Sequence, residues 1–413
     1  MSNSLWMMSE KIVSIFGLIF VTSFVAKYVG PGVFGTIALA MSIFQIVQIV
    51  AQLGTDVLIF KRLSKSVNSG VNLINVTVPI RALVYLICSL PVLIYYCLQM
   101  GGYTSLYVVA AFLACFIQSM DVYSIYYDAT LNSKINTFVN IFGLIASLLM
   151  RWLIAYLHVN PLWLCVPIIL AALIPCSIRL CYFLTRSNHS KIPRKYKQKY
   201  IRYVIGAGSS FVLSSLSVAI YTRLSLIMLG AINGPSAVGV YSVAATLATS
   251  WAFILNSFIT STLPSIFSER NDVNTLLKGA RLNLLVIGIA APVIIGVYFL
   301  GEWFIRYFYG DVFLPSFIPL IILCFSTLFG ALSTVSARII AKYAGYSFLS
   351  RKMLLVALSG FVLNWIFIVN YGIIGAAYAN MITQLLSLTF FNYPFKNGVI
   401  FKLHLNTILL KIK

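Results

Sequence analysis

Residues 186–202 read Arg-Ser-Asn-His-Ser-Lys-Ile-Pro-Arg-Lys-Tyr-Lys-Gln-Lys-Tyr-Ile-Arg, and they divide the sequence into two long apolar parts. The segment carries seven Lys or Arg residues and no acid, whereas the 185 residues before it and the 211 after it are almost unbroken apolar sequence. A segment this polar cannot cross a bilayer, and its positive charge predicts that it stays on the cytoplasmic side. We interpret it as a hinge loop between two halves, each long enough for six membrane spans.

The composition of the 413-residue chain is typical of a helical membrane protein that crosses the bilayer many times. Hydrophobic residues make up 61% and charged residues 9%, and the mean hydropathy is +0.97. The net charge of +21 would suggest nucleic-acid binding in a soluble protein. Here the Lys and Arg residues lie in short connecting loops, where membrane topology and contact with anionic lipids explain them better. No nucleic-acid partner is therefore expected.

The apolar sequence can be divided into twelve segments of about 20 residues or more, the length that a helix needs to cross the hydrocarbon core. They are expected at 10–29, 33–60, 76–99, 104–129, 136–157, 161–185, 203–230, 237–262, 281–301, 315–336, 350–370 and 374–395. The predicted fold class is an all-α polytopic membrane protein with twelve transmembrane helices in two lobes. The lobes are expected at 1–185 and 203–395, with the basic cytoplasmic loop 186–202 between them and a basic cytoplasmic tail at 396–413.

The distribution of positive charge supports this arrangement. If the N-terminus is cytoplasmic, the cytoplasmic segments hold 23 of the 29 Lys and Arg residues, and the opposite side holds only Lys27 and Arg306. The remaining four lie within predicted spans: Arg81, Arg151, Arg179 and Arg223. Because a missing helix would scramble this asymmetry, both termini are expected in the cytoplasm.

The two halves share a short pattern at equivalent places. Gly30-Pro31-Gly32-Val33-Phe34-Gly35 follows the first span, and Gly234-Pro235-Ser236-Ala237-Val238-Gly239 follows the seventh, 204 residues later. A recurrent Gly-Pro turn would explain the likeness alone, but the matching offset, topology and following polar pattern favour a true repeat. Parallel repeats of this kind predict a pseudo-two-fold axis along the membrane normal.

The second span carries a polar face. It consists of residues spaced i, i+3, i+7 and i+11, which are Gln45, Gln48, Gln52 and Asp56. A shift of 204 places Thr249, Asn256 and Thr260 at three of these positions in the eighth span. Polar side chains within a bilayer need a partner or a water-filled cavity. Interhelical hydrogen bonding is one explanation, but three glutamines and an aspartate favour a cavity, so these residues are candidates for substrate binding.

Arginines deep within the spans are further cavity candidates. Arg151 lies on one face of the fifth span with Asn136 and Asn140, and Arg223 is similarly deep in the seventh. A central arginine costs about 2.5–3.5 kcal/mol on insertion scales, so an unpaired one facing lipid is not expected. Two interpretations of Arg151 stay open: binding of substrate, together with Asn140, or a buried ion pair with an acid of the fourth span, Asp121 or Asp128. Arg81 and Arg179 lie near the cytoplasmic ends of their spans and are expected to snorkel.

Only three acids lie within predicted spans, all in the first half: Asp56, Asp121 and Asp128. Four arginines against three aspartates suit an anionic ligand better than a cationic drug. If an inward proton or sodium ion drives transport, one of these acids must bind it, and Asp56 is the first candidate because it ends the glutamine face. The alternative is that the acids only neutralise Arg151 or Arg81.

The sequence gives no support for catalysis. It contains no nucleophile–base pair, no metal-ligand spacing and no phosphate-binding loop, so we expect neither enzyme activity nor a cofactor or metal. The seven cysteines fall within predicted helices, and we interpret them as free thiols.

Four short patterns carry a resemblance to a known family. They are Val29-Gly30-Pro31-Gly32-Val33-Phe34-Gly35-Thr36, its counterpart at Gly234–Tyr241, Gly301-Glu302-Trp303-Phe304-Ile305 leading to Tyr309-Gly310, and Gly360-Phe361-Val362-Leu363-Asn364 leading to Asn370-Tyr371-Gly372-Ile373-Ile374-Gly375-Ala376-Ala377. With them, the sequence resembles the polysaccharide-exporter branch of the multidrug/oligosaccharidyl-lipid/polysaccharide (MOP) exporter superfamily, most closely the Wzx-type O-antigen flippases.

The resemblance implies two six-helix lobes whose first, second, seventh and eighth spans line a central cavity in a bacterial inner membrane. The implied substrate is an oligosaccharide on undecaprenyl diphosphate, moved from the cytoplasmic to the periplasmic leaflet by alternating access. A polysaccharide polymerase and a chain-length regulator are candidate partners. The first span has few cations beyond Lys11 and Lys27, so the diphosphate-binding residues stay open. The alternatives are a cation-coupled drug exporter of the same fold, or a membrane polymerase or ligase, which typically carries a large periplasmic loop that is absent here.

The predicted topology can be tested with fused reporters. A reporter placed near Lys195 should behave as cytoplasmic because of the surrounding positive charge, and one placed near Gly234 should behave as periplasmic. The reverse pattern, measured with paired alkaline phosphatase and green fluorescent protein fusions, would contradict the twelve-helix topology.

Overall fold

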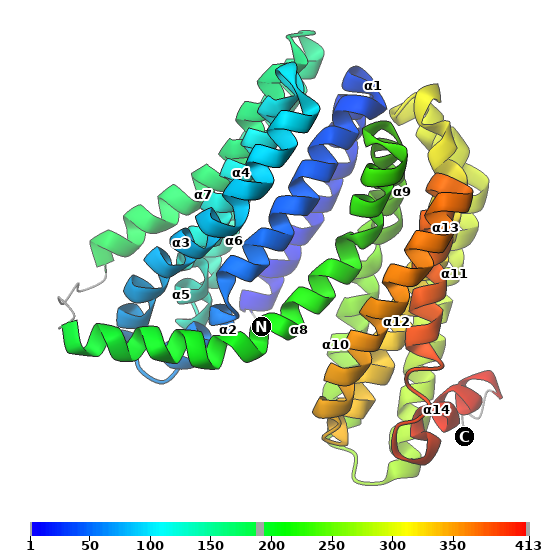
Figure 1. Cartoon of the computed structure of the whole chain (residues 1–413). Coiled ribbons are helices and arrows are strands. Elements are labelled where there is room, and N and C mark those ends of the chain that lie inside the picture. The colour runs from blue at the N-terminus through cyan, green and yellow to red at the C-terminus, as the bar shows by residue number, and fades with distance from the viewer. Residues whose placement is uncertain (1, 187–193, 410–413) are drawn as a thin grey trace. The chain divides into compact units, whose positions relative to one another are not determined.

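The computed structural model describes residues 2–186 and 194–409, and this part of the chain consists of helices and short connections without a strand (Figure 1). It divides into two compact units, residues 1–223 and 224–413, which we describe separately. Residues 187–193 of the expected hinge loop lie outside the described residues, and the lobe boundaries predicted above stay a prediction.

The expected spans are present as helical segments. Nine helices of the described part are long and apolar enough to cross a membrane. Two of them contain two segments each, because α1 (Ser2–Gln52) is non-helical at Gly30 and α13 (Tyr346–Leu388) is non-helical at Gly372. The 40-residue helix α8 (Arg194–Asn233) corresponds to the seventh expected span. The predicted all-α polytopic fold is confirmed.

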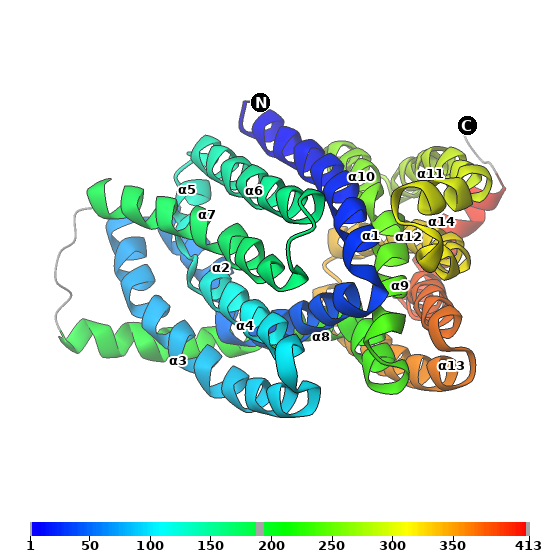
Figure 2. The ribbon, with the colours of Figure 1, turned by 90° about the horizontal axis from the view of Figure 1, so that it is seen from above.

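Unit 1 contains α1 and six further helices before α8. These are α2 (Thr55–Leu63), α3 (Val67–Met100), α4 (Ser105–Met120), α5 (Tyr123–Ala129), α6 (Ser133–Tyr156) and α7 (Cys165–Arg186). α1 packs against α6 and α4, and α7 packs against both α4 and α6 (Figure 2). The second segment of α1 together with α2, and likewise α4 together with α5, correspond to one predicted span each, interrupted by a short non-helical break.

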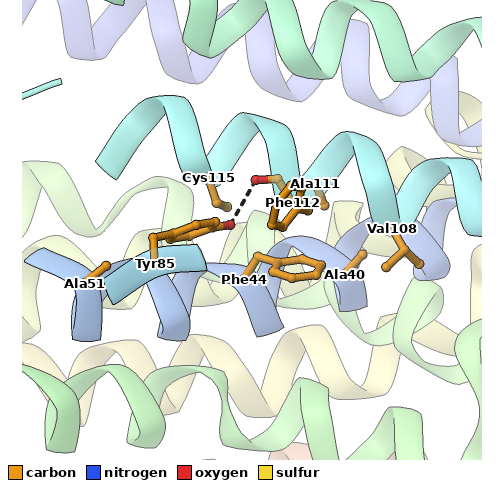
Figure 3. Packing of buried hydrophobic residues seen from close by; sticks show 8 residues of the cluster. All are labelled: Ala40, Phe44, Ala51, Tyr85, Val108, Ala111, Phe112 and Cys115. Atoms are coloured by element: carbon orange, nitrogen blue, oxygen red, sulfur yellow. Dashed lines mark hydrogen bonds between the residues drawn. The ribbon is translucent and has the colours of Figure 1, made fainter. Parts of the chain in front are cut away.

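Aromatic side chains fill the contact between α1, α3 and α4 (Figure 3). The ring of Phe44 meets that of Phe112 edge-on at 5.8 Å, and the hydroxyl of Tyr85 donates to the carbonyl oxygen of Phe112 at 2.9 Å. All three side chains are at most 8% exposed. Because lipid tails are as apolar as these residues, close packing and hydrogen bonding rather than water exclusion hold such helices together.

Unit 2 contains the end of α8 and six further helices. These are α9 (Pro235–Ser250), α10 (Ala252–Phe267), α11 (Asp272–Phe308), α12 (Phe317–Lys342), α13 and α14 (Val399–Ile408). α12 lies at the centre and packs against α13, α11 and α9. The expected basic tail thus includes a helix, α14, which packs against α11.

The repeated Gly-Pro turns adopt the same conformation in both units. Gly30 has φ 74° and ψ 173°, and Gly234 has φ 83° and ψ 175°. A positive φ favours glycine, and the following Pro31 and Pro235 have the fixed φ that suits the first residue of a helix. The shared geometry supports the predicted repeat of this element.

Another positive-φ glycine, Gly372 with φ 54°, interrupts the helical geometry of α13. A Cβ atom added to the nearby Gly375 would lie 1.9 Å from the carbonyl oxygen of Phe367, in the preceding segment of the same helix. The two segments can therefore approach so closely only because residue 375 is glycine.

Gly375→Ala should consequently destabilise unit 2 by about 1–3 kcal/mol or more, as overpacking does. Gly296→Ala is the matched control, because a Cβ there meets nothing within 4 Å in α11 and alanine is the better helix former. Thermal unfolding of the purified variants in detergent measures the difference. Equal unfolding temperatures for the two variants would show that the turn in α13 is looser than described.

Candidate functional site

The glutamine face of the second span lies on the second segment of α1. Gln45, Gln48 and Gln52 are half-buried, and the Oε1 atom of Gln45 is buried without a hydrogen-bond partner among the described residues. α1 ends at Gln52, and the positive φ angles of Leu53 and Gly54 turn the chain. The prediction that one helix carries this face through Asp56 was therefore wrong, because Asp56 belongs to the separate helix α2.

Asp56 forms an ion pair with Arg81 of α3, a residue that is 1% exposed. The same guanidinium donates from Nε to Thr55 Oγ1 at 2.9 Å and from Nη1 to the carbonyl oxygen of Ser119 at 3.3 Å. Arg81 thus links the start of α2 to the end of α4. The Asp56 side chain is 46% exposed, so the carboxylate lies at the edge of this cluster.

A second arginine cluster lies at the break between α4 and α5. Arg179 of α7 donates to Asp121 Oδ2 at 2.6 Å and to Asn140 Oδ1 at 2.9 Å. It also donates to Asn136 Oδ1 at 3.3 Å, and the amide of Asn136 donates to Asp128 Oδ1 at 2.9 Å. Asn136 and Asn140 therefore share one face of α6, as their spacing predicted.

These clusters correct two sequence-based expectations. Arg81 and Arg179 do not snorkel, because they are 1% and 5% exposed and each contacts an aspartate. The alternative ion pair of Arg151 with Asp121 or Asp128 is also wrong, because Arg179 and Asn136 occupy those carboxylates. The reading in which Asp56 neutralises Arg81 is supported.

Arg151 has a different environment from these two arginines. It lies near the end of α6, half-buried, and forms no hydrogen bond or ion pair with any residue that the structure describes. Arg223 of α8 likewise forms no hydrogen bond or ion pair with a residue in the described ranges. Both guanidiniums are therefore available to an anion.

In unit 2 the expected polar face is exposed. Thr249 of α9 and Asn256 and Thr260 of α10 all have exposed side chains. In contrast, the exposed side chains of α13 are large and apolar, for example Phe361 at 52% and Trp365 at 57%. Lipid favours an apolar surface such as that of α13. The polar α9–α10 face is therefore better suited to a water-filled cavity than to contact with hydrocarbon.

The sequence reasoning missed the buried amine of Lys352 in α13. This side chain is 2% exposed, and its Nζ donates to Ser333 Oγ at 3.3 Å. Ser333 Oγ lies 3.1 Å from Ser387 Oγ in the second segment of α13. Lys352 lies near the end of a predicted span, where an exposed cytoplasmic lysine is common. Only the packing in the structure shows that this lysine is buried. All seven cysteines are free thiols, as predicted.

The clusters predict the outcome of removing a charge. Asp121→Asn leaves Arg179 buried without its counter-charge and should destabilise unit 1 by about 3–5 kcal/mol, whereas adding Arg179→Met should restore part of this loss. Asp311→Asn, at a pair whose carboxylate is 78% exposed, should change stability by less than about 1 kcal/mol. Thermal unfolding of the purified proteins tests both. An Asp121→Asn variant of unchanged stability that lacks transport would instead indicate cation coupling.

Comparison with solved structures identifies the fold. The chain is 14% identical to an inward-facing multidrug-resistance MATE family transporter of the MOP superfamily, with a TM-score of 0.73 over 96% of this chain and 99% of that one. It is 16% identical to the lipid II flippase MurJ in an inward closed conformation, with a TM-score of 0.70 over 99% and 91% of the two chains. At such identities the likeness shows the fold alone.

The sequence itself shows the family. No curated protein matches the chain. Residues 1–269, however, match the polysaccharide biosynthesis protein family, which covers all of unit 1 together with α9 and α10. The chain is a multi-pass membrane protein with the fold of MOP transporters, and it belongs to the polysaccharide biosynthesis protein family.

Proposed function

We propose that this protein is a flippase for a lipid-linked oligosaccharide. Its substrate would carry a glycan on undecaprenyl diphosphate, of the O-antigen repeat-unit kind, and move from the cytoplasmic to the periplasmic leaflet of a bacterial inner membrane. Movement would occur by alternating access between the two lobes, with both termini in the cytoplasm. A polysaccharide polymerase and a chain-length regulator would act on the product.

The balance of uncompensated charge carries this proposal. Asp56 and Asp121 form ion pairs, and Asp128 accepts a hydrogen bond from Asn136. Arg151 and Arg223 have no comparable partner in the described part of the chain. A cavity built from these groups would present cations, and a diphosphate is an anion that arginine binds through two hydrogen bonds at once.

The polar faces supply groups for the glycan. Gln45, Gln48 and Gln52 in unit 1, and Thr249 and Asn256 in unit 2, offer amides and hydroxyls that bind sugar hydroxyls without a net charge. These amide and hydroxyl residues carry no charge, a property that fits a neutral oligosaccharide. The family assignment agrees with a substrate from polysaccharide synthesis.

A cation-coupled drug exporter of the same fold is the second candidate, because several similar solved structures are MATE transporters. Such an exporter needs a free carboxylate for its cationic substrate. Asp56 is the acid best placed for coupling, because its side chain is 46% exposed while its partner Arg81 is buried. Protonation of Asp56 would weaken its ion pair with Arg81. This change would link proton binding to the position of α2 relative to α1.

Flipping can be tested with the purified protein in liposomes that contain a fluorescent undecaprenyl diphosphate oligosaccharide. Loss of a charge-assisted contact costs about 1.5–3 kcal/mol, so Arg151→Gln should slow flipping at least about tenfold. Arg306→Gln is the matched control, because this arginine is exposed and forms its ion pairs with Glu302 and Asp311 in unit 2. Thermal unfolding checks that both variants fold.

The same assay separates the candidates. Export of a cationic dye but no flipping of the glycolipid would favour the drug exporter. Normal flipping by a folded Arg151→Gln variant would show that this arginine does not bind the diphosphate.

A further inference from the structure

Two of the patterns noted in the sequence meet at a groove in unit 2 that the proposed transport does not use. The groove has a volume of about 510 Å³, within the range of about 300–1,000 Å³ that is usual for small-molecule sites. Its walls are mainly the apolar side chains of Leu314, Phe317, Ile318, Ile373 and Ile374. Glu302 and Tyr371 also line the groove and are its residues with polar side-chain groups.

The walls are held firmly by their local structure. Gly310, with φ 91°, turns the chain out of α11, and the buried rings of Tyr309 and Phe313 pack with their centroids 6.0 Å apart. A Cβ atom on Gly301 would lie 3.1 Å from the ring of Phe317, so glycine allows this wall to approach α11. The groove is therefore part of the fold rather than a loose gap in a loop.

Three charged residues, Glu302, Arg306 and Asp311, form ion pairs beside the groove, and we call them its rim. Together they carry an excess of negative charge. Arg306 Nη2 lies 3.2 Å from Glu302 Oε1, and Arg306 Nε lies 3.4 Å from Asp311 Oδ1. Two carboxylates and one guanidinium give the rim a formal charge of −1. All three side chains are more than half exposed, so they remain available to a ligand.

Exposed aromatic residues indicate that this end of unit 2 lies at a membrane surface. Trp303 and Tyr307 are stacked with centroids 5.7 Å apart and are 60% and 64% exposed, and Tyr371 is 65% exposed. Exposed Trp and Tyr residues are enriched at the level of lipid head groups. An apolar groove that opens at this level is placed to receive an acyl chain.

We propose that this groove binds a phospholipid whose head group carries a primary ammonium, such as phosphatidylethanolamine. One acyl chain lies along Phe317, Ile318 and Ile374. The ammonium donates hydrogen bonds to Glu302, and the phosphate contacts Arg306. The site is independent of the transported lipid.

The negative charge of the rim favours binding of this lipid over binding of anionic lipids. A diphosphate lipid or an anionic phospholipid would bring negative charge to a rim that is already −1, which is unfavourable. A quaternary ammonium has no N–H group to donate to a carboxylate, whereas a primary ammonium has three. The order of binding should therefore be phosphatidylethanolamine, then phosphatidylcholine, then phosphatidylglycerol.

Native mass spectrometry of the full-length protein tests this order with the three phospholipids at equal acyl-chain length. Because exposed ion pairs contribute little, we expect about three- to fivefold stronger retention of phosphatidylethanolamine than of phosphatidylglycerol. Glu302→Gln brings the rim charge to zero and should reduce this preference to less than about twofold. Ile318→Trp fills the groove and should reduce retention of all three lipids.

Glu269→Gln is the matched control for Glu302→Gln. Glu269 lies beyond the opposite end of α11, and hydrogen bonding from Lys278 lowers the pKa of its carboxyl, so it is a charged carboxylate in an ion pair of 2.7 Å. This variant should keep the wild-type preference. Equal or stronger retention of phosphatidylglycerol, or an unchanged preference in Glu302→Gln, would overturn the proposal. Stronger retention of an undecaprenyl diphosphate lipid that Ile318→Trp abolishes would assign the groove to the tail of the transported lipid instead.

Discussion

The packing of unit 1 depends on two buried arginines that hold broken membrane helices in place. A break in a membrane helix frees backbone groups that lipid cannot hydrogen-bond. Arg81 donates hydrogen bonds at two such breaks. It binds the Thr55 hydroxyl at the start of α2 and the carbonyl oxygen of Ser119 at the end of α4. Arg179 binds Asp121 at the turn between α4 and α5. Removing one guanidinium would leave its aspartate buried or half-buried without a counter-charge, which is costly in a low-dielectric surrounding.

This structural use of charge determines which groups remain for a ligand. Each buried arginine needs a carboxylate, and Asp56 and Asp121 are committed to that role. The Arg179 cluster is still incompletely satisfied, because Arg179 Nε and Asp121 Oδ1 are buried without a partner among the described residues. Each buried polar atom without a partner costs desolvation free energy. Protonation of the carboxylate or a shift of the helices would reduce this cost.

The sequence predicted the features that follow from charge and periodicity. The apolar segments predicted the all-helical polytopic fold, and the Gly-Pro patterns predicted turns that Gly30 and Gly234 indeed form with the same backbone angles. The helix break after Gln52 was not predicted. Gly54 permits a positive φ, but the adjacent Leu53, which also has a positive φ, gives no such signal in the sequence. The pairing of Asp56 with Arg81 was one of the predicted alternatives, but the pairing of Arg179 with Asp121 was not predicted, since these residues are 58 positions apart and only packing brings them together.

The helices of unit 2 are held together without acids in the predicted spans. Neutral groups join several of its helices: Ser326 donates to Asn380 Oδ1 at 2.7 Å, and Thr327 donates to the carbonyl oxygen of Ala248 at 3.0 Å. Hydroxyls and amides need no counter-charge, so the helices of this unit can present a polar face such as Asn256 without burying an ion. Its carboxylates instead lie at the ends of α11, where water and lipid head groups reach them. The two halves of the repeat thus differ. Buried arginine–aspartate pairs join helices in the first half, whereas the second half has its described ion pairs near the ends of α11 and keeps one buried cation, Lys352, beside serine hydroxyls.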